Sequence, residues 1–307
     1  MSTSAAFSRR PSINDLIGNG LLALDTGALL QQWRMGPDLR SLYRSCLDQL
    51  ASRIFVPYQT LRELQDRVPT IINDTAQELS QVKRAIDENR WDAQRTKLVR
   101  RCHHAGLPRD ITRIFQSQTQ AAYELLVSAA EDRREELEAD QEEAAEFLGY
   151  IRDMDWLTGQ PPDKAKALDW DRRARMMVRQ KVPPAIADNG NKPPEKARLG
   201  DCLIWLELLE VADWFRTDIV LVTEDYKPGG WVARHPDGAL ETNAYLVNTM
   251  WEAANVQFSV IGTDNLIDYC QQTQNAPAAP HLVPIPEPPD SRDAVVRPLP
   301  LFTAWNE

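Results

Sequence analysis

Short apolar runs alternate with amphipathic stretches at both ends of the chain. Residues 21–24 are all apolar and predict a buried strand, and residues 26–50 show the three-to-four-residue apolar spacing of a helix. A second predicted strand over 53–57 leads into another helix. The pattern returns later in three elements: a helix that opens at Gly200-Asp201, a strand over 219–223, and a strand and helix over 256–270. Such alternation indicates an α/β fold with a parallel sheet flanked by helices.

The middle of the chain has a different rhythm, because nearly everything from 71 to 155 follows a helical period. One stripe recurs in steps of four and three: Tyr123, Val127, Ala130, Arg134, Leu137, Gln141, Ala144, Leu148 and Ile151. A heptad rhythm of this kind predicts two long, coiled-coil-like helices packed as an antiparallel hairpin. The sheet domain is therefore expected to be interrupted by a long α-helical hairpin insertion.

These patterns divide the chain into four segments. The first part of the sheet domain covers 18–66, the insertion 67–181, the second part of the sheet domain 182–272, and a tail 273–307. The tail contains eight prolines between Pro277 and Pro300, and this composition predicts an extended segment without a core of its own. Its last residues are apolar enough to dock on the chain's own body or on a protein partner.

Composition narrows the class of protein. No apolar run approaches the roughly 20 residues of a membrane-spanning helix, and residues 1–11 lack the apolar stretch of a signal peptide. We therefore expect a cytoplasmic protein without a membrane partner. The 4 cysteines among 307 residues are too scattered for a zinc motif or a disulfide scaffold, and we expect reduced thiols.

The net charge of −10 is unfavourable for binding nucleic acid, but its distribution is uneven. Residues 131–146 hold nine acids and two arginines, a net charge of −7. Two other stretches, 83–101 and 166–181, are basic. These stretches are either solvated helix faces or a track for nucleic acid, and the sequence leaves both interpretations open.

Carboxylates stand where the predicted strands end. Asp25 follows the first strand and Asp225 follows the strand over 219–223, while Glu63 and Asp201 lie on the helices between. Each acid alone is more typical of a helix cap or a solvated side chain. Together they would meet at the carboxyl edge of one sheet, where their repulsion needs a cation. Mg²⁺ or Mn²⁺ held by such acids is typical of phosphodiester cleavage.

Five short stretches of the sequence, one of which begins with two prolines after a valine, together form a recognisable pattern. They are Leu24-Asp25-Thr26-Gly27-Ala28-Leu29-Leu30, Val56-Pro57-Tyr58-Gln59-Thr60-Leu61-Arg62-Glu63, Gly200-Asp201-Cys202-Leu203-Ile204-Trp205, Val222-Thr223-Glu224-Asp225, and Val182-Pro183-Pro184 through Asp188. The set resembles the PIN-like nuclease superfamily, in particular its bacterial branch with a helical insertion. The resemblance covers roughly half of the chain.

The resemblance implies an acidic pocket for Mg²⁺ or Mn²⁺. Its residues, carried over position by position, are Asp25, Glu63, Asp201 and Asp225 as catalytic metal ligands, Asp188 and Glu224 as further ligands, and Thr26, Thr223 and Lys227 toward the substrate. The run Ala185-Ile186-Ala187-Asp188 departs from the longer Gly-aromatic-Lys-Asp run usual in the branch. Neighbouring Glu224 and Asp225 would point to opposite sides if the strand continued through them.

The sequence motifs of several other enzyme classes are missing from this chain. A haloacid-dehalogenase phosphatase needs a second aspartate two residues after its nucleophile, and Asp25 is followed by Thr26 and Gly27. The chain contains no Gly-x-x-x-x-Gly-Lys-Ser/Thr loop, no Gly-x-Gly-x-x-Gly turn and no Gly-x-Ser-x-Gly elbow.

Two functions of different classes remain. The first is a metal-dependent nuclease, with an endoribonuclease favoured over a deoxyribonuclease, in the toxin-like or phage-defence setting that the resemblance implies. The second is an inactive PIN-like scaffold whose hairpin and tail bind a protein partner, or a second copy of the chain. The intact set of acids favours the nuclease, whereas the negative charge and the long insertion favour the scaffold.

Overall fold

The computed structural model describes residues 11–87, 90–105, 108–153, 156–185 and 199–274. They form two compact units. Unit 1 holds residues up to Gln32, Pro37–Gln65 and the chain from Ile151 onward, and unit 2 holds Trp33–Gly36 and Asp66–Tyr150. Asp188 and the predicted tail from residue 275 lie outside the described residues.

Unit 1 is built on a parallel sheet. Its strands are β1 (Leu21–Leu24), β2 (Ile54–Val56), β3 (Leu157–Thr158), β4 (Ile219–Val222) and β7 (Phe258–Ile261), in the order β3-β2-β1-β4-β7. All four pairings are parallel. Leu24 pairs with Val222, so the next residues, Asp25 and Thr223, leave the same edge of the sheet side by side. The predicted parallel α/β sheet is confirmed.

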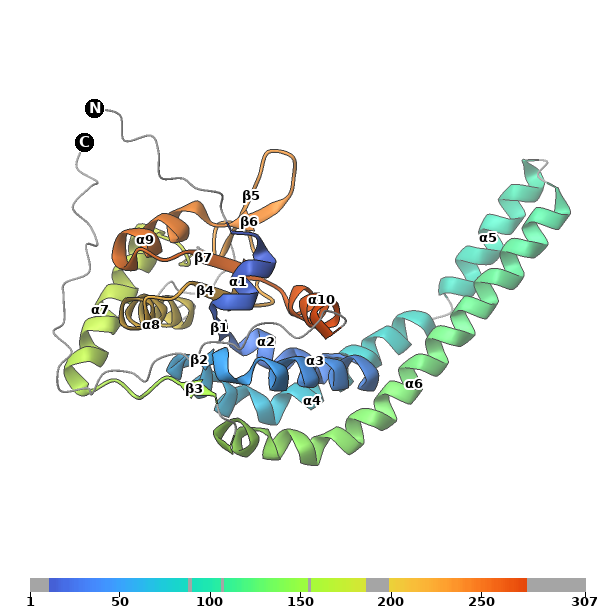
Figure 1. Cartoon of the computed structure of the whole chain (residues 1–307). Helices are drawn as coiled ribbons and strands as arrows, with labels where there is room; N and C mark the ends of the chain where they lie inside the picture. Colours follow the sequence, from blue (N-terminus) through green and yellow to red (C-terminus); the bar gives the residue numbers. More distant parts are fainter. Residues whose placement is uncertain (1–10, 88–89, 106–107, 154–155, 186–198, 275–307) are drawn as a thin grey trace. The chain divides into compact units, whose positions relative to one another are not determined.

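Helices cover both faces of this sheet (Figure 1). Figure 1 shows α7 (Lys164–Gln180), α8 (Leu199–Phe215) and α9 (Ala244–Ala254) on one side and α1 (Ile13–Asn19), α3 (Pro37–Gln49) and α10 (Thr263–Gln274) on the other. The short α2 (Thr26–Leu30) follows β1, and single 3₁₀ turns span Gln31–Arg34 and Ala51–Arg53. Strands buried on both faces need apolar side chains at every position, which explains why β1 and β4 read as unbroken apolar runs.

The core on the α8 side is aromatic. Trp205 lies edge-on to Trp231 at 6.4 Å and to Phe258 at 5.0 Å between ring centroids. Leu21 and Leu221 belong to the same buried cluster. Since α8 packs against the sheet, α7 and α9, it needs apolar residues almost all round, and most of its sequence is apolar. A two-stranded antiparallel hairpin, β5 (Val232–Arg234) and β6 (Leu240–Thr242), precedes α9.

Unit 2 consists of long helices. α4 (Tyr58–Asp87) begins in unit 1 and continues into unit 2, followed by α5 (Arg90–His104) and α6 (Arg109–Asp153). α5 and α6 run antiparallel (Figure 1), which confirms the predicted helical hairpin. Within the predicted stripe, Leu137 and Ala144 are buried. Trp33 packs edge-on to Phe147 at 5.8 Å.

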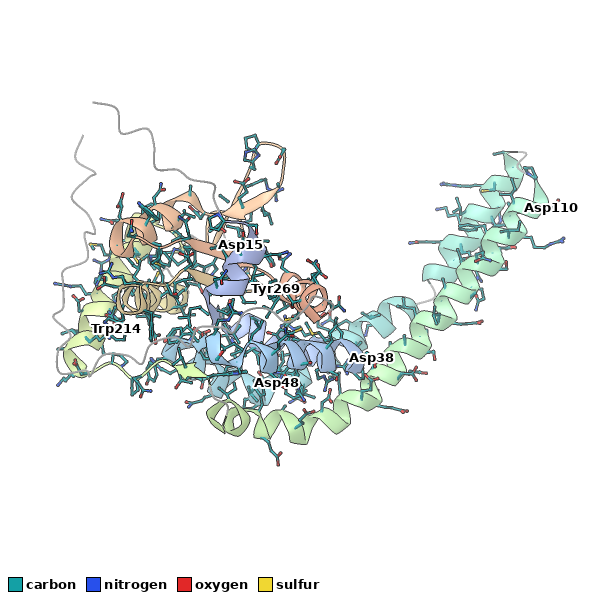
Figure 2. The ribbon with its side chains drawn as sticks, in the orientation of Figure 1. Asp15, Asp38, Asp48, Asp110, Trp214 and Tyr269 are labelled. Carbon is teal, nitrogen blue, oxygen red and sulfur yellow. The ribbon has the colours of Figure 1, made fainter. Side chains whose placement is uncertain are left out.

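The expected end of the insertion at residue 181 differs from the division between the compact units, because unit 2 ends at Tyr150. α7 belongs to unit 1 and buries Trp170, Ala174 and Met177. The indole N–H of Trp170 donates to Glu210 Oε1 of α8 at 3.1 Å. Figure 2 shows Trp214, at the end of α8, beside the α7 ribbon. Among the described residues, no helix combines the length and apolarity needed to span a membrane.

Candidate functional site

Asp25 stands at the end of β1 and begins α2 as its N-cap. Its Oδ1 accepts a hydrogen bond from the Gly27 N–H at 2.5 Å, as a capping aspartate does. Its Oδ2 accepts a hydrogen bond from the Thr223 hydroxyl, at the end of β4. Asp25 is therefore a helix cap and also a link between the two central strands.

The electrostatic surroundings of Asp25 are unusual for a cap. Part of its surface reaches solvent, yet protein atoms surround the carboxyl group, and this burial is the main reason why its pKa is raised to about 6. The hydrogen bonds from Thr223 and Gly27 lower the pKa, whereas the charges of Glu63 and Asp225 raise it. Glu63 and Asp225 are thus each close enough to Asp25 to repel its charge.

Glu63 lies on the first turns of α4 and is held by two neighbours. Its Oε2 accepts from the Thr26 hydroxyl at 2.9 Å, and its Oε1 accepts from the Gln59 side-chain amide at 2.9 Å. Gly200 lies against the same carboxylate, because a Cβ there would stand 2.3 Å from Glu63 Oε1. A side chain at residue 200 would therefore push the Glu63 carboxylate out of its present position.

Asp201 follows Gly200 in the first turn of α8 and is half-buried. Its charge adds to the effect of burial that raises the pKa of the neighbouring Cys202 thiol to about 12. The close approach of Gly200 to Glu63 places the start of α8, with Asp201, beside the α4 acid. Asp201 is thus linked to Glu63 through the backbone of its chain neighbour Gly200.

Asp225 is tied to the end of β4 through Thr223. The fully buried Thr223 hydroxyl accepts from the Asp225 N–H at 3.0 Å while it donates to Asp25. Asp225 Oδ1 accepts from the backbone N–H of Lys227 at 3.2 Å, and the Lys227 side chain is exposed. Thr223 is therefore the residue through which two of the predicted acids are joined.

Glu224 has a different role in the structure. Its Oε1 accepts from the Thr263 N–H at 3.0 Å and from the Thr263 hydroxyl at 2.7 Å, at the first residue of α10. This carboxylate thus holds the start of α10 against the end of β4. Its neighbour Asp225 bonds instead to the loop that follows β4.

No three His, Cys, Asp or Glu side chains within the described ranges stand close enough together to form a metal-binding group in this structure. The chemistry of the donor set still suits a hard divalent cation, because Asp25, Glu63, Asp201 and Asp225 offer only oxygen. Burial already disfavours the ionised form of Asp25, and the negative charges of Glu63 and Asp225 disfavour it further. A cation would relieve this repulsion.

Two further residues of this region, Gln59 and Glu207, hold parts of the site in place. Gln59 orients Glu63, and nothing distinguishes it in the sequence from a solvated helix residue. Glu207 is 5% exposed in the middle of α8, and both of its carboxylate oxygens face the Tyr58 N–H, at 3.0 and 2.9 Å. The signal in the sequence is an acid with apolar residues on both sides, since Glu207 is the only charged residue in the run 202–209.

The sequence model of the PIN-like domain matches residues 21–246 of the chain. The matched region begins at β1, ends in α9, and includes all four central acids. The chain therefore belongs to the PIN-like domain family, which has a nuclease-type fold. No match was found among curated proteins or among solved structures.

Proposed function

We propose that this PIN-like protein is a metal-dependent nuclease that hydrolyses phosphodiester bonds, with RNA as the favoured substrate. The observation that carries the proposal is Asp25, a surrounded carboxylate at the junction of β1 and β4 whose pKa is raised further by the charges of Glu63 and Asp225. A scaffold gains nothing from acids that repel each other. A nuclease needs them to hold a cation.

In this proposal Asp25, Glu63, Asp201 and Asp225 hold one or two Mg²⁺ or Mn²⁺ ions. The chemistry that such ions supply is the activation of water and the neutralisation of charge on the phosphodiester. The chain's own contribution is orientation. Thr223 fixes the rotamer of Asp25 by its hydrogen bond, and Glu63 is fixed by a donor on each of its oxygens.

The remaining predicted residues orient the carboxylates, contact the substrate or anchor a helix. Thr26 acts on Glu63 and Thr223 on Asp25, so both hydroxyls orient carboxylates. The exposed ammonium group of Lys227 is free to reach a phosphate of the substrate as a point charge. Asp188 stays a predicted ligand, and Glu224 contributes by anchoring α10.

The scaffold alternative is favoured by one specific observation. Large apolar side chains on α6 are exposed, with Leu125 at 72%, Ile114 at 61% and Ile111 at 56%. Exposed apolar side chains of this size on one helix suit contact with another protein. The two functions are compatible in one chain, since the acids lie in unit 1 and these residues in unit 2.

Cleavage of labelled tRNA, single-stranded RNA and plasmid DNA in Mn²⁺ tests the proposal. We expect the wild type to cleave RNA and Asp201→Ala to be inactive. Asp213→Ala is the matched control, because Asp213 lies on the same helix and pairs with Arg216 at 2.5 Å. Equal cleavage by wild type and Asp201→Ala would remove Asp201 from the mechanism, and no cleavage by the wild type would refute the nuclease.

A further inference from the structure

The start of α4 lacks an ordinary cap. Pro57 occupies the N-cap position, because its carbonyl accepts the Leu61 N–H at 3.1 Å. The first N–H groups of a helix have no partner inside it, and a Ser, Thr, Asp or Asn side chain at the N-cap normally supplies an acceptor. A proline side chain has none. The first turn of α4 therefore needs an acceptor from elsewhere in the protein.

Glu207 of α8 supplies that acceptor across the fold. Its two carboxylate oxygens lie 3.0 and 2.9 Å from the backbone nitrogen of Tyr58, the first residue of α4. The negative charge also faces the positive end of the helix dipole. Burial raises the pKa of Glu207 to about 7, while the backbone N–H groups of Tyr58 and Gln59 lower it.

The surrounding backbone is shaped to admit this carboxylate. A Cβ on Gly159, just after β3, would lie 1.9 Å from Glu207 Oε1 and 2.4 Å from the Tyr58 nitrogen. The Gly159 N–H donates to the carbonyl of Val56 at 2.8 Å, which fixes this glycine beside the end of β2. Three segments therefore converge on one carboxylate, and any side chain at 159 would displace it.

The position of this contact connects it to the acids. α4 carries Gln59 and Glu63 within its first two turns, and α8 carries Asp201 and Glu207. The two helices meet at both ends of this stretch: Glu207 bonds to Tyr58, and Gly200 stands against the Glu63 carboxylate. Two contacts along one pair of helices fix both the distance and the rotation of α4, whereas one contact would leave rotation free.

We propose that Glu207 is a positioning residue that caps α4 from α8 and thereby fixes Glu63 beside the start of α8 that carries Asp201. The consequence for metal binding rests on the proposed nuclease function, whereas the capping itself does not. Losing residues that orient metal ligands commonly reduces metal affinity ~10-fold or more. Glu207 acts one step further from the metal, because it bonds to Tyr58 at the start of the helix that carries Glu63 and not to Glu63 itself.

Glu207→Gln tests the inference, with Glu210→Gln as the matched control. The amide keeps the size of the side chain but removes the charge and replaces one acceptor by a donor that faces an N–H. The control removes a carboxylate from the same helix that bonds to Lys166 and Trp170, not to α4. We expect faster amide hydrogen exchange over residues 58–65 in Glu207→Gln only. We also expect a ~10-fold higher Mn²⁺ concentration for half-maximal thermal stabilisation in that variant.

The two readouts separate the two proposals. Unchanged exchange over 58–65 in Glu207→Gln overturns the capping. Faster exchange with the Mn²⁺ requirement of the control overturns the positioning role. A wild type that Mn²⁺ does not stabilise refutes the metal site instead. If Glu207→Gln does not fold, Glu207→Asp provides the same comparison, because it keeps the charge and withdraws the carboxylate from Tyr58 by one methylene.

Discussion

Replacing Asp25 by asparagine should stabilise the metal-free protein at alkaline pH. The pKa of Asp25 is raised from 3.8 to about 6 in the folded state. The difference of about 2 pKa units corresponds to ~3 kcal/mol by which the folded state disfavours the ionised carboxyl group. The amide is never charged, but it loses the acceptor for the Thr223 hydroxyl, at a cost of ~1 kcal/mol. The expected net gain at pH 8 is ~2 kcal/mol.

The sign of this effect depends on pH. Because the pKa of Asp25 is higher in the folded state, the folded protein binds more protons between pH 3.8 and about 6, and its stability falls as pH rises through that window. Below it the carboxyl group is neutral in both states and only the lost hydrogen bond remains. Asp25→Asn should therefore be less stable than the wild type by ~1 kcal/mol below pH 4 and more stable at pH 8.

Urea unfolding at 25 °C in EDTA, followed by tryptophan fluorescence from about pH 3 to pH 8, measures the difference between the two proteins. Comparing them cancels the contributions of other groups, including Glu207, whose raised pKa of about 7 acts in the same direction. A difference that does not change with pH, or a variant less stable at pH 8, would refute the electrostatic argument. Added Mn²⁺ at 100 times its Kd should then stabilise the wild type alone, by ~2.7 kcal/mol.

Three further outcomes are expected. Gly200→Ala places a methyl group 2.3 Å from Glu63 Oε1, so the carboxylate must shift, and the Mn²⁺ concentration for half-maximal thermal stabilisation should rise ~10-fold or more while circular dichroism stays unchanged. An unchanged Mn²⁺ requirement would contradict this. Thr223→Val removes the hydroxyl that bonds to Asp25, so the pKa of Asp25 measured by NMR should rise further, and an unchanged pKa would contradict the hydrogen bond. Trp205→Ala should lower the free energy of unfolding by ~3–5 kcal/mol, and a loss below 1 kcal/mol would show that the aromatic cluster is not part of the core.

The sheet could be predicted because its strands are buried on both faces and need unbroken apolar runs. β1, β2 and β4 leave this signal in the sequence, whereas the edge strand β7 contains Ser259 and is only partly buried. β3 consists of Leu157–Thr158 alone, and two residues are too few for a periodic pattern. The strand order depends on pairing between distant segments, which local spacing does not encode.

Helical period does not tell which partner a helix packs against, so the sequence alone does not assign α7 to one of the two compact units. α7 is as charged as a solvated hairpin helix, and its assignment to unit 1 depends on three buried side chains and on contacts with α8. The contacts that orient the acids are only partly predictable. The family resemblance points to Thr223, which bonds to Asp25 across 198 residues, but nothing in the sequence links Glu207 to Tyr58, 149 residues away.

Capping and catalysis are not exclusive interpretations of the acids in this fold. Asp25 caps α2, Glu224 holds the first residue of α10, and Glu207 holds the first residue of α4. Each carboxylate lies at a helix N-terminus, where the helix dipole and unpaired N–H groups favour negative charge. For Asp25, the hydrogen bonds from Gly27 and Thr223 lower the pKa and so offset part of the effect of burial and of the charges of Glu63 and Asp225. The same carboxyl edge of the sheet can therefore concentrate acids for a metal while the helix starts keep the metal-free protein folded.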